Sequence, residues 1–317
     1  MKHTSTAPRR LYERICRSES SILALTGLTL PEFQNLATEF AKDWIDYHER
    51  YTLEGKPRER RLSKQEAGPL PTIEDKLLFI CSYLKAYPIQ ELHAAIFDME
   101  QSHTNVWIHR LAEFLFKTLE RLRHVPCRHA QALEHLLQGC ERLYLDGTER
   151  PIQRSHDDEQ QEKDFSGKKK AHTKENLILC TPTQQVVYLG PTYSGSAVDM
   201  TMAREQGFRF PNGLELLVDL GFKGFTLPNV HILLPHKKPR NGELTQEQKD
   251  YNALVASARV VNEHSISGIK RCRCVKDKFR NWKQGFDDKV MVLATALHNL
   301  RVSVRETYSH SPIATAT

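Results

Sequence analysis

The sequence lacks the features of several large protein classes. Its seven cysteines form no Cys-x-x-Cys pair, and Cys272 and Cys274 have no partner pair at zinc-finger spacing, so we expect reduced thiols. The longest mostly apolar run, Val290 to Leu297, is far shorter than the ~20 residues that cross a bilayer. The N-terminal segment has no apolar core and no small-residue cleavage site, so we expect a cytoplasmic protein.

The motifs of common nucleotide and nucleophile enzymes are also missing. The sequence contains no Gly-rich phosphate loop, no dinucleotide-binding fingerprint and no Ser/His/Asp arrangement. Its charge imbalance is small, because 45 Lys and Arg stand against 39 Asp and Glu, a net charge of +6. A hydrophobic content of 39% excludes a disordered chain, and a length of 317 residues suggests about two domains.

The positive charge is gathered in three runs, at residues 56–64, 168–170 and 270–283. One basic run is usually solvated surface, but three favour a partner with a phosphate backbone. The candidate backbone contacts in the last two runs and near them are Lys168, Lys169, Lys170, His172, Lys174, Arg259, Lys270, Arg271, Arg273, Lys278 and Arg280.

The first half of the chain has the periodicity of helices. Residues 29–51 predict an amphipathic helix that begins with a capping box formed by Thr29 and Glu32. A charged stretch broken by Gly and Pro follows at 54–71 and is typical of a linker. A further helix is predicted at 73–84.

Residues 88–97 and the stretch from Gln101 onward predict a short helix, a tight turn and a longer helix. This is the spacing of a helix-turn-helix, whose second helix can enter the major groove of DNA. Plain packing of two helices explains the pattern equally well. If the second helix contacts DNA, the candidate residues are Gln101, Ser102, Asn105, His109 and Arg110.

From Glu141 the pattern changes to short apolar runs bounded by turn residues. Such runs are typical of buried strands in a mixed sheet, and they cover 143–145, 177–179, 186–189, 216–218 and 232–234. Helices are predicted at 197–206, from Thr245 past Ile269, and at 286–302, and we expect residues 307–317 to be disordered. The second half therefore predicts an α/β domain, a mixed sheet flanked by helices.

Two predicted strands run directly into an aspartate, Asp146 in one case and Asp219 in the other. A carboxylate at the end of a buried strand is costly unless it is paired, hydrogen-bonded or bound to metal, and strand ends are where α/β folds place ligands. Capping of the following turn explains the pair equally well. Glu263, on the long helix between Arg259 and Lys270, would complete a set of three carboxylates able to hold two divalent cations.

Other carboxylates fit this role less well. Residues 157–159 are expected in a polar loop, Asp287 and Asp288 at the start of a helix, and Asp199 in the first turn of a short helix. Acidic side chains are favourable near a helix N-terminus, which suffices to explain Asp199 and the 287–288 pair.

Three blocks of the sequence closely resemble the catalytic blocks of bacterial insertion-sequence transposases of the DDE superfamily. They are DGTERPIQRSHDDEQQEKDFSGKKKAHTK (146–174), VDLGFKG (218–224) and ARVVNEHSISGIKRCRCVKDKFRN (258–281). QSHTNVWIHRL (101–111) resembles the helix-turn-helix of the same family, which usually has Gly where this chain has Asp98. Asp tolerates a left-handed turn better than most residues, so we expect the turn to survive.

The resemblance implies a helix-turn-helix DNA-binding region followed by a ribonuclease-H-like catalytic domain. The expected divisions are a helical segment and linker (1–65), the helix-turn-helix domain (66–138), the catalytic domain (139–308) and a tail (309–317). It further implies that Asp146, Asp219 and Glu263 form the metal-binding DDE triad. Two Mg²⁺ ions, replaceable by Mn²⁺, would be the cofactors.

By the same resemblance, the chain is a DNA transposase of a bacterial cytoplasm, associated with the nucleoid when bound to DNA. It would bind the terminal inverted repeats of its element, cut the strand ends and join them to target DNA, as a homodimer or larger assembly. Two alternatives remain open at this stage. One is a DNA-binding regulator or domesticated protein on an inactive nuclease fold, and the other is a metal-dependent endonuclease without strand transfer.

Overall fold

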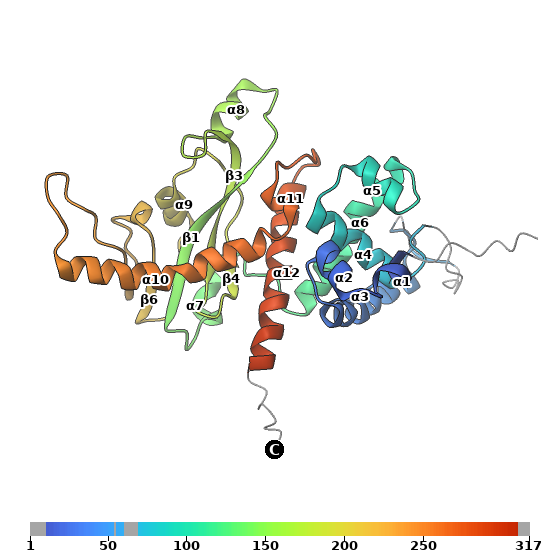
Figure 1. Cartoon of the computed structure of the whole chain (residues 1–317), viewed down its shortest axis with the longest axis horizontal. Helices are drawn as coiled ribbons and strands as arrows, with labels where there is room; N and C mark the ends of the chain where they lie inside the picture. The colour runs from blue at the N-terminus through green and yellow to red at the C-terminus, as the bar shows by residue number, and fades with distance from the viewer. Residues whose placement is uncertain (1–10, 54, 60–68, 310–317) are drawn as a thin grey trace, which may run out of the picture. The chain divides into compact units, whose positions relative to one another are not determined.

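The structure is a computed structural model that describes residues 11–53, 55–59 and 69–309 (Figure 1). The chain divides into two compact units, one formed by the residues up to His124 with Arg271–Cys274, the other by the remaining residues. The domain divisions expected near residues 65 and 138 stay predictions. The linker expected at 54–71 lies largely outside the described residues.

The described residues of the first unit form mainly helices. Its α3 begins with the predicted capping box, because Thr29 accepts a hydrogen bond from Glu32 N–H while the Glu32 carboxylate accepts one from Thr29 N–H. Trp44 of α3 packs against Phe114 of α6, with ring centroids 4.8 Å apart. The helices are α1 (Leu11–Ile15), α2 (Glu19–Thr26), α3 (Leu30–Arg50), α4 (Ile73–Ala86), α5 (Gln90–Ile96) and α6 (Gln101–Arg121).

The helices α5 and α6 pack together across a four-residue turn, as a helix-turn-helix requires. Asp98 in this turn has a φ of +52°, so it adopts a left-handed conformation. The expectation that Asp98 preserves the turn is confirmed. Asn105 of α6 donates a hydrogen bond to Gln90 of α5 at 3.2 Å, which fixes the two helices side by side.

The second unit is built on a seven-stranded mixed sheet. β3 pairs antiparallel with β1 and β4, whereas β6 pairs parallel with β1 and β7. Two-residue strands β2 and β5 add to β3. The strands are β1 (Arg142–Pro151), β2 (Phe165–Ser166), β3 (Ala171–Cys180), β4 (Val186–Leu189), β5 (Tyr193–Ser194), β6 (Leu214–Leu217) and β7 (Val230–Leu233).

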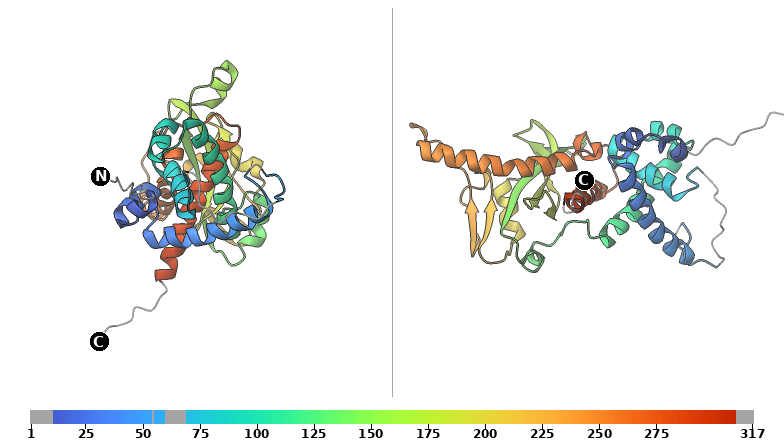
Figure 2. Two further views of the ribbon diagram at one scale, coloured as in Figure 1. Left: turned by 90° about the vertical axis from the view of Figure 1, so that its right-hand side faces the viewer. Right: turned by 60° about the horizontal axis from the view of Figure 1, so that its bottom comes forward.

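Helices cover both faces of this sheet (Figures 1 and 2). Antiparallel strands followed by parallel ones, with helices on both faces, form the ribonuclease-H-like α/β fold expected from the sequence. The helical segments after His124 are η1 (Ala130–Ala132), α7 (Leu133–Leu136), α8 (Asp158–Asp164), α9 (Asp199–Gln206), η2 (Leu220–Phe222), α10 (Gln246–Ile269), α11 (Arg273–Lys276) and α12 (Phe286–Ser309).

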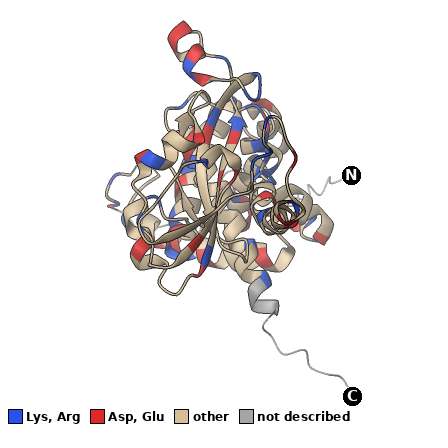
Figure 3. Ribbon diagram, turned by 90° about the vertical axis from the view of Figure 1, so that its left-hand side faces the viewer, with Lys and Arg blue, Asp and Glu red and all other residues tan. Residues whose placement is uncertain are grey.

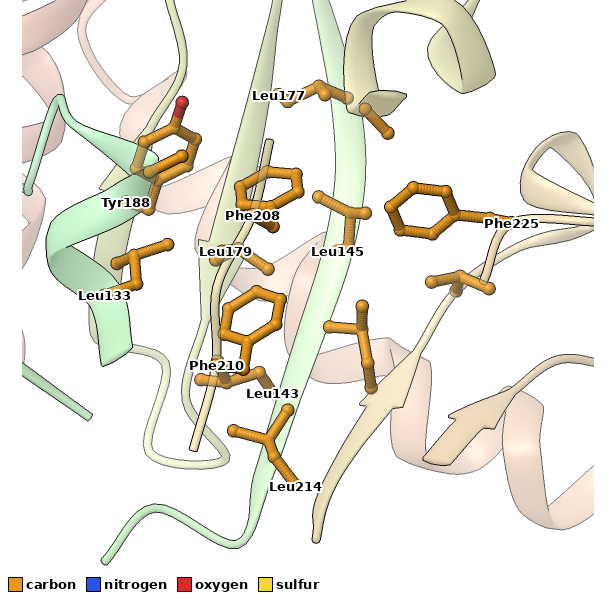
Figure 4. Close-up of a cluster of buried hydrophobic side chains, with 14 of the residues drawn as sticks. Leu133, Leu143, Leu145, Leu177, Leu179, Tyr188, Phe208, Phe210, Leu214 and Phe225 are labelled. Carbon is orange, nitrogen blue, oxygen red and sulfur yellow. The ribbon is translucent and has the colours of Figure 1, made fainter. Parts of the chain in front are cut away.

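Alternation along β1 assigns each face of the sheet. Leu143 and Leu145 point into an apolar core that also contains Met202 and Ala203 of α9 (Figure 4). Tyr144 and Asp146 alternate with these leucines, so their side chains point to the opposite face of the sheet. The helices α10 and α12 cover that face. The core is therefore on the α9 side at this end of the sheet.

Two local predictions were wrong. Residues 157–159, expected in a polar loop, begin α8, where Asp157 caps the helix by accepting a hydrogen bond from Gln160 N–H. The helix α12 continues to Ser309, so residues 307–309 are helical and not part of a disordered tail. Residues 310–317 lie outside the described residues.

Candidate active site

Asp146 lies within β1, next to the C-terminal end of β6. β6 pairs with β1 only from Arg142 to Tyr144, whereas β3 accompanies β1 as far as Pro151. The prediction that the strand ends at Asp146 was therefore wrong, because pairing with β3 continues past it. Its Oδ1 accepts a hydrogen bond of 2.8 Å from the N–H of Gly147.

Asp219 follows β6 and lies alongside Asp146. Tyr144 pairs with Leu217 in the parallel ladder, and each aspartate stands two residues beyond its member of this pair. The Asp219 carboxylate accepts a hydrogen bond of 2.7 Å from Gly221 N–H and so caps η2. The structure thus brings together two of the three carboxylates predicted from the sequence.

The surroundings of Asp146 disfavour its charged form. The pKa of Asp146 is raised to about 6, mainly by burial and also by the negative charges of Asp219 and Asp199, whereas the Arg259 guanidinium lowers it. Arg259 Nη2 lies 3.8 Å from Asp146 Oδ2. A nearby cation stabilises the charged form of a carboxylate whose pKa is raised, so the surroundings of Asp146 favour positive charge.

A third carboxylate, Asp199, lies beside these two. Asp199 is the first residue of α9, and burial raises its pKa; Asp219 acts in the same direction, whereas the ammonium of Lys168 lowers it. Glu175 of β3 is its hydrogen-bonded neighbour, and burial together with the charges of Asp199 and Glu149 raises the pKa of Glu175. The sequence analysis explained Asp199 by its helix terminus alone and did not single out Glu175.

Two glycines leave the space that the Asp199 carboxylate occupies. A Cβ at Gly147 would collide with Asp199 Oδ1 and lie 2.7 Å from Glu175 Oε1. A Cβ at Gly221 would lie 2.8 Å from Asp219 Oδ1 and 3.4 Å from Asp199 Oδ2. Both carboxylates therefore reach the same small volume over Gly221. The glycines that follow Asp146 and Asp219 are the one signal in the sequence that could have pointed to this packing.

Glu263, the third predicted carboxylate, lies one turn after Arg259 on α10 and is exposed. Within the part of the chain that the structure describes, it forms no ion pair or hydrogen bond. Lys270, at the end of the helix, has its pKa lowered by burial and by the charge of Lys169. The role of Glu263 as a metal ligand stays a prediction.

The buried side of α10 begins at Val255, whereas the neighbouring Leu254 is 72% exposed. Asn262 and Ser265 complete this buried side together with Ile269. This side of α10 is therefore partly polar, and the helix packs against β1 and β3.

The donor set suits a hard divalent cation, since Asp146, Asp199 and Asp219 offer only carboxylate oxygens. Asp199 Oδ1 is buried and lies on the same side of Gly147 as Glu175 Oε1. Among the described residues, no three His, Cys, Asp or Glu side chains are close enough together to hold an ion as they stand.

The residues predicted to contact the phosphate backbone of DNA lie in three separate parts of the sequence. On the structure, Lys and Arg are interspersed with Asp and Glu (Figure 3). Lys168, Lys169 and Lys170 are exposed in the turn between β2 and β3, and Lys168 lines a cavity of about 240 Å³ beside Asp199. Lys174 forms an ion pair of 2.7 Å with buried Asp164. The ring of His172 packs against Phe165, and Arg271, Arg273, Lys278 and Arg280 are exposed.

The predicted DNA-contacting side of α6 is mixed in exposure. Gln101 and Ser102 are exposed, and Asn105 and His109 are half-buried. The Arg110 guanidinium lies over the ring of Trp107, 5.2 Å from its centroid. The amide of Gln101 donates to Gln90 of α5, as that of Asn105 does. All seven cysteines are free, as predicted.

The fold and the paired strand carboxylates define a nuclease of the ribonuclease-H-like class. Residues 145–299 match the family described as DDE superfamily endonuclease. The chain is also 26% identical over 253 residues to the probable transposase for insertion sequence element IS702 of Microchaete diplosiphon, covering 79% of this chain and 88% of the relative. The greater part of the second unit thus matches the DDE superfamily endonucleases, and most of the chain is similar to an insertion-sequence transposase.

No solved structure matches the chain significantly. None of the described helices is long and apolar enough to cross a membrane.

Proposed function

We propose that this protein is the transposase of a bacterial insertion sequence, which cuts DNA at the terminal inverted repeats of the element and joins the freed end to target DNA. The observation that carries the proposal is the register of β1 and β6, which sets Asp146 beside Asp219 in a DDE endonuclease domain. DNA is the partner that the family implies.

Asp146, Asp219 and Glu263 would hold two Mg²⁺ ions, which supply activation of the attacking oxygen and stabilisation of the leaving oxygen. Arg259, 3.8 Å from Asp146, holds that carboxylate from the α10 side. The exposed Lys168, Lys169 and Lys278 would bind the phosphate backbone and fix its register. The side chains of the helix-turn-helix would contact base edges of the repeat.

The reaction consists of two displacements at phosphorus. In the first, water attacks the phosphodiester at the element end, the P–O3′ bond breaks, and the element keeps a 3′-hydroxyl. In the second, this hydroxyl attacks a target phosphodiester, so one P–O bond forms as another breaks and a target 3′-hydroxyl leaves. No covalent enzyme intermediate is involved. Two ends must be processed together, so we propose a homodimer or larger assembly on DNA.

The test uses a duplex that carries the terminal repeat of the element and a supercoiled target plasmid. Wild type is compared with Asp146→Asn, Asp219→Asn and Glu263→Gln, in Mg²⁺ or EDTA, with Asp158→Asn as the control for loss of an exposed carboxylate. We expect site-specific nicks and joined products only with Mg²⁺, and only in wild type and the control. Nicks without joined products would indicate an endonuclease. Repeat binding without any cleavage would indicate a regulator on an inactive fold.

A further inference from the structure

Trp282 differs from the other tryptophans of the chain in its surroundings. Trp44 is 8% exposed and stacks on the half-buried Trp107, with ring centroids 6.2 Å apart, so both belong to the packing of the first unit. Trp282, in the second unit, is 69% exposed. Within the described residues its ring contacts no other ring and its indole N–H donates no hydrogen bond. Packing of the fold therefore does not explain this side chain.

The loop that carries Trp282 is fixed at both ends. Phe279 before it and Phe286 after it are buried, with ring centroids 6.4 Å apart. Phe286 N–H donates a hydrogen bond of 3.1 Å to the carbonyl oxygen of Lys283, and the Asn281 side chain accepts one of 2.9 Å from Lys283 N–H. The indole is therefore presented to solvent from an anchored turn, so that ordering of the loop adds little to the cost of binding through it.

This loop lies at the carboxyl end of β1, the strand that contains Asp146. Phe279 N–H donates a hydrogen bond of 2.9 Å to the carbonyl oxygen of Pro151, and Phe279 pairs with Ile152 in a parallel bridge. Pro151 is the last residue of β1, and the strand between it and Asp146 is roughly 17 Å long. Successive bases of a DNA strand are about 3.4 Å apart, so the loop lies within about five nucleotides of a phosphate bound at Asp146.

Cations without ion-pair partners flank the indole. Lys278 and Lys283 precede and follow it in the sequence and are exposed, and neither ammonium forms an ion pair or hydrogen bond within the described part of the chain. Ile152 N–H donates a hydrogen bond of 3.0 Å to the carbonyl oxygen of His172, so the basic run 168–170 ends beside the same strand. A single exposed apolar residue is ordinary, but an aromatic ring among unpaired cations is the combination that binds unpaired bases and their phosphates.

We propose that Trp282 stacks on an unpaired base of the DNA that is processed at this site, while Lys278 and Lys283 bind the phosphates beside that base. The inference rests on the proposed function for its ligand, because DNA is the partner. Every base has a ring face, so this contact holds a base without selecting its identity. Duplex DNA offers that face only where a base has left the stack, next to a nick, a mismatch or a strand end.

The first experiment measures binding of the full chain to terminal-repeat DNA that is supplied already cut at the element end, by fluorescence anisotropy. One form of this DNA is fully paired, and the other has unpaired bases next to the cut. The variants are Trp282→Ala and Trp282→Phe. Leu254→Ala is the matched control, because Leu254 is an apolar side chain of the same unit that is 72% exposed.

We expect Trp282→Ala to weaken binding of the form with unpaired bases between about 5-fold and 100-fold, the loss that stacking on one base predicts, and to leave binding of the paired form nearly unchanged. Trp282→Phe should restore most of the affinity, since a phenyl ring still stacks, and Leu254→Ala should bind as wild type. Equal affinities of wild type and Trp282→Ala for the unpaired form would overturn the inference. If wild type binds neither form, the proposed function itself fails, and the inference fails with it.

The second experiment observes the stacked base directly. The fluorescent base 2-aminopurine, whose emission falls when it stacks, replaces one base at a time from the cut end inward. We expect a position that is quenched by wild type and Trp282→Phe but not by Trp282→Ala. The same emission at every position with wild type and Trp282→Ala would contradict the inference. So would a change in the oligomeric state of Trp282→Ala without DNA, measured by sedimentation, because the ring would then contact protein.

Discussion

At the scale of single residues, several polar side chains of this protein are buried and each contacts a specific partner. His93 of α5 is 1% exposed, and its Nε2 lies 3.1 Å from the carbonyl oxygen of Phe79. Lys174 and Asp164 form a largely buried ion pair. These residues stabilise the fold, and each supports a prediction that separates structure from catalysis.

His93 should make the stability of the protein fall as the solution is acidified. Burial lowers the pKa of His93 from 6.5 to about 4, so the unfolded chain binds the proton more readily than the native state. The stabilisation is complete above pH 6.5 and is lost as the pH falls toward 4. Between pH 7 and pH 5 we expect a loss on the order of 2 kcal/mol from this residue.

Urea unfolding at pH 7 and pH 5, followed by tryptophan fluorescence, tests this prediction. His93→Gln keeps a side-chain N–H donor but cannot titrate, so its stability should fall less on acidification than that of wild type. His103→Gln, an exposed change on α6, is the control and should behave as wild type. The same loss in wild type and His93→Gln would contradict the prediction.

Lys174 should contribute to the stability of the fold rather than to DNA binding. Its ammonium pairs with Asp164, whose side chain is 4% exposed, so Lys174→Ala leaves a buried charge without its cation. Removing one partner of a buried pair costs about 3 kcal/mol. The exposed pair of Lys163 and Glu159 is the control, and Lys163→Ala should change stability by less than about 0.5 kcal/mol. Equal Tm values for the two variants would refute this assignment.

At the scale of elements, the contact between α10 and α12 depends on a glycine inside a helix. A Cβ at Gly268 of α10 would collide with the ring of His298 on α12, and His298 Nε2 lies 2.9 Å from the carbonyl oxygen of Gln184. The ring of His298 is therefore fixed between Gly268 and the carbonyl group of Gln184. Glycine is unfavourable within a helix, so its presence here reflects close packing.

Gly268→Ala should destabilise the protein even though alanine has the higher helix propensity. We expect a loss of about 1–3 kcal/mol, the usual cost of overpacking, measured by chemical denaturation. Ser267→Ala changes the neighbouring exposed residue of the same helix and should be within about 0.5 kcal/mol of wild type. A more stable Gly268→Ala variant would show that α10 and α12 can separate without cost.

At the scale of the whole molecule, a net charge of +6 is too small to hold DNA by itself, so the placement of the basic side chains matters more than their number. Exposed Lys278 and Arg280 belong to the basic run that follows α10. Lys42, by contrast, is paired with Glu39 on α3. This difference allows a matched test of backbone binding.

The combined change Lys278→Ala and Arg280→Ala should weaken binding of terminal-repeat DNA and reduce the slope of log K against log salt by about 2, one unit for each lost phosphate contact. Lys42→Ala should leave the slope unchanged. Fluorescence anisotropy between low and moderate salt measures both. An unchanged slope in the double variant would exclude this run from the DNA-binding surface.

Local patterns in the sequence were sufficient to predict most helices and strands and to find two residues of the candidate site. The capping box at Thr29 and Glu32 and the left-handed Asp98 depend on neighbouring residues alone, so they could be predicted and are confirmed. Asp146 and Asp219 could be found because each follows an apolar run, which marks a buried strand. The boundaries of β1 and α8 could not, because strand length depends on a partner such as β3.

The sequence by itself therefore determined the helical first half, the mixed sheet, the resemblance to DDE transposases and the strand carboxylates. The tertiary structure decided which other side chains join them, because α9 brings Asp199 over Gly147 from a position remote in the chain. It also decided that Glu263 faces solvent while Arg259 reaches Asp146. Periodicity shows which residues are buried, but only packing between distant elements determines which charges meet.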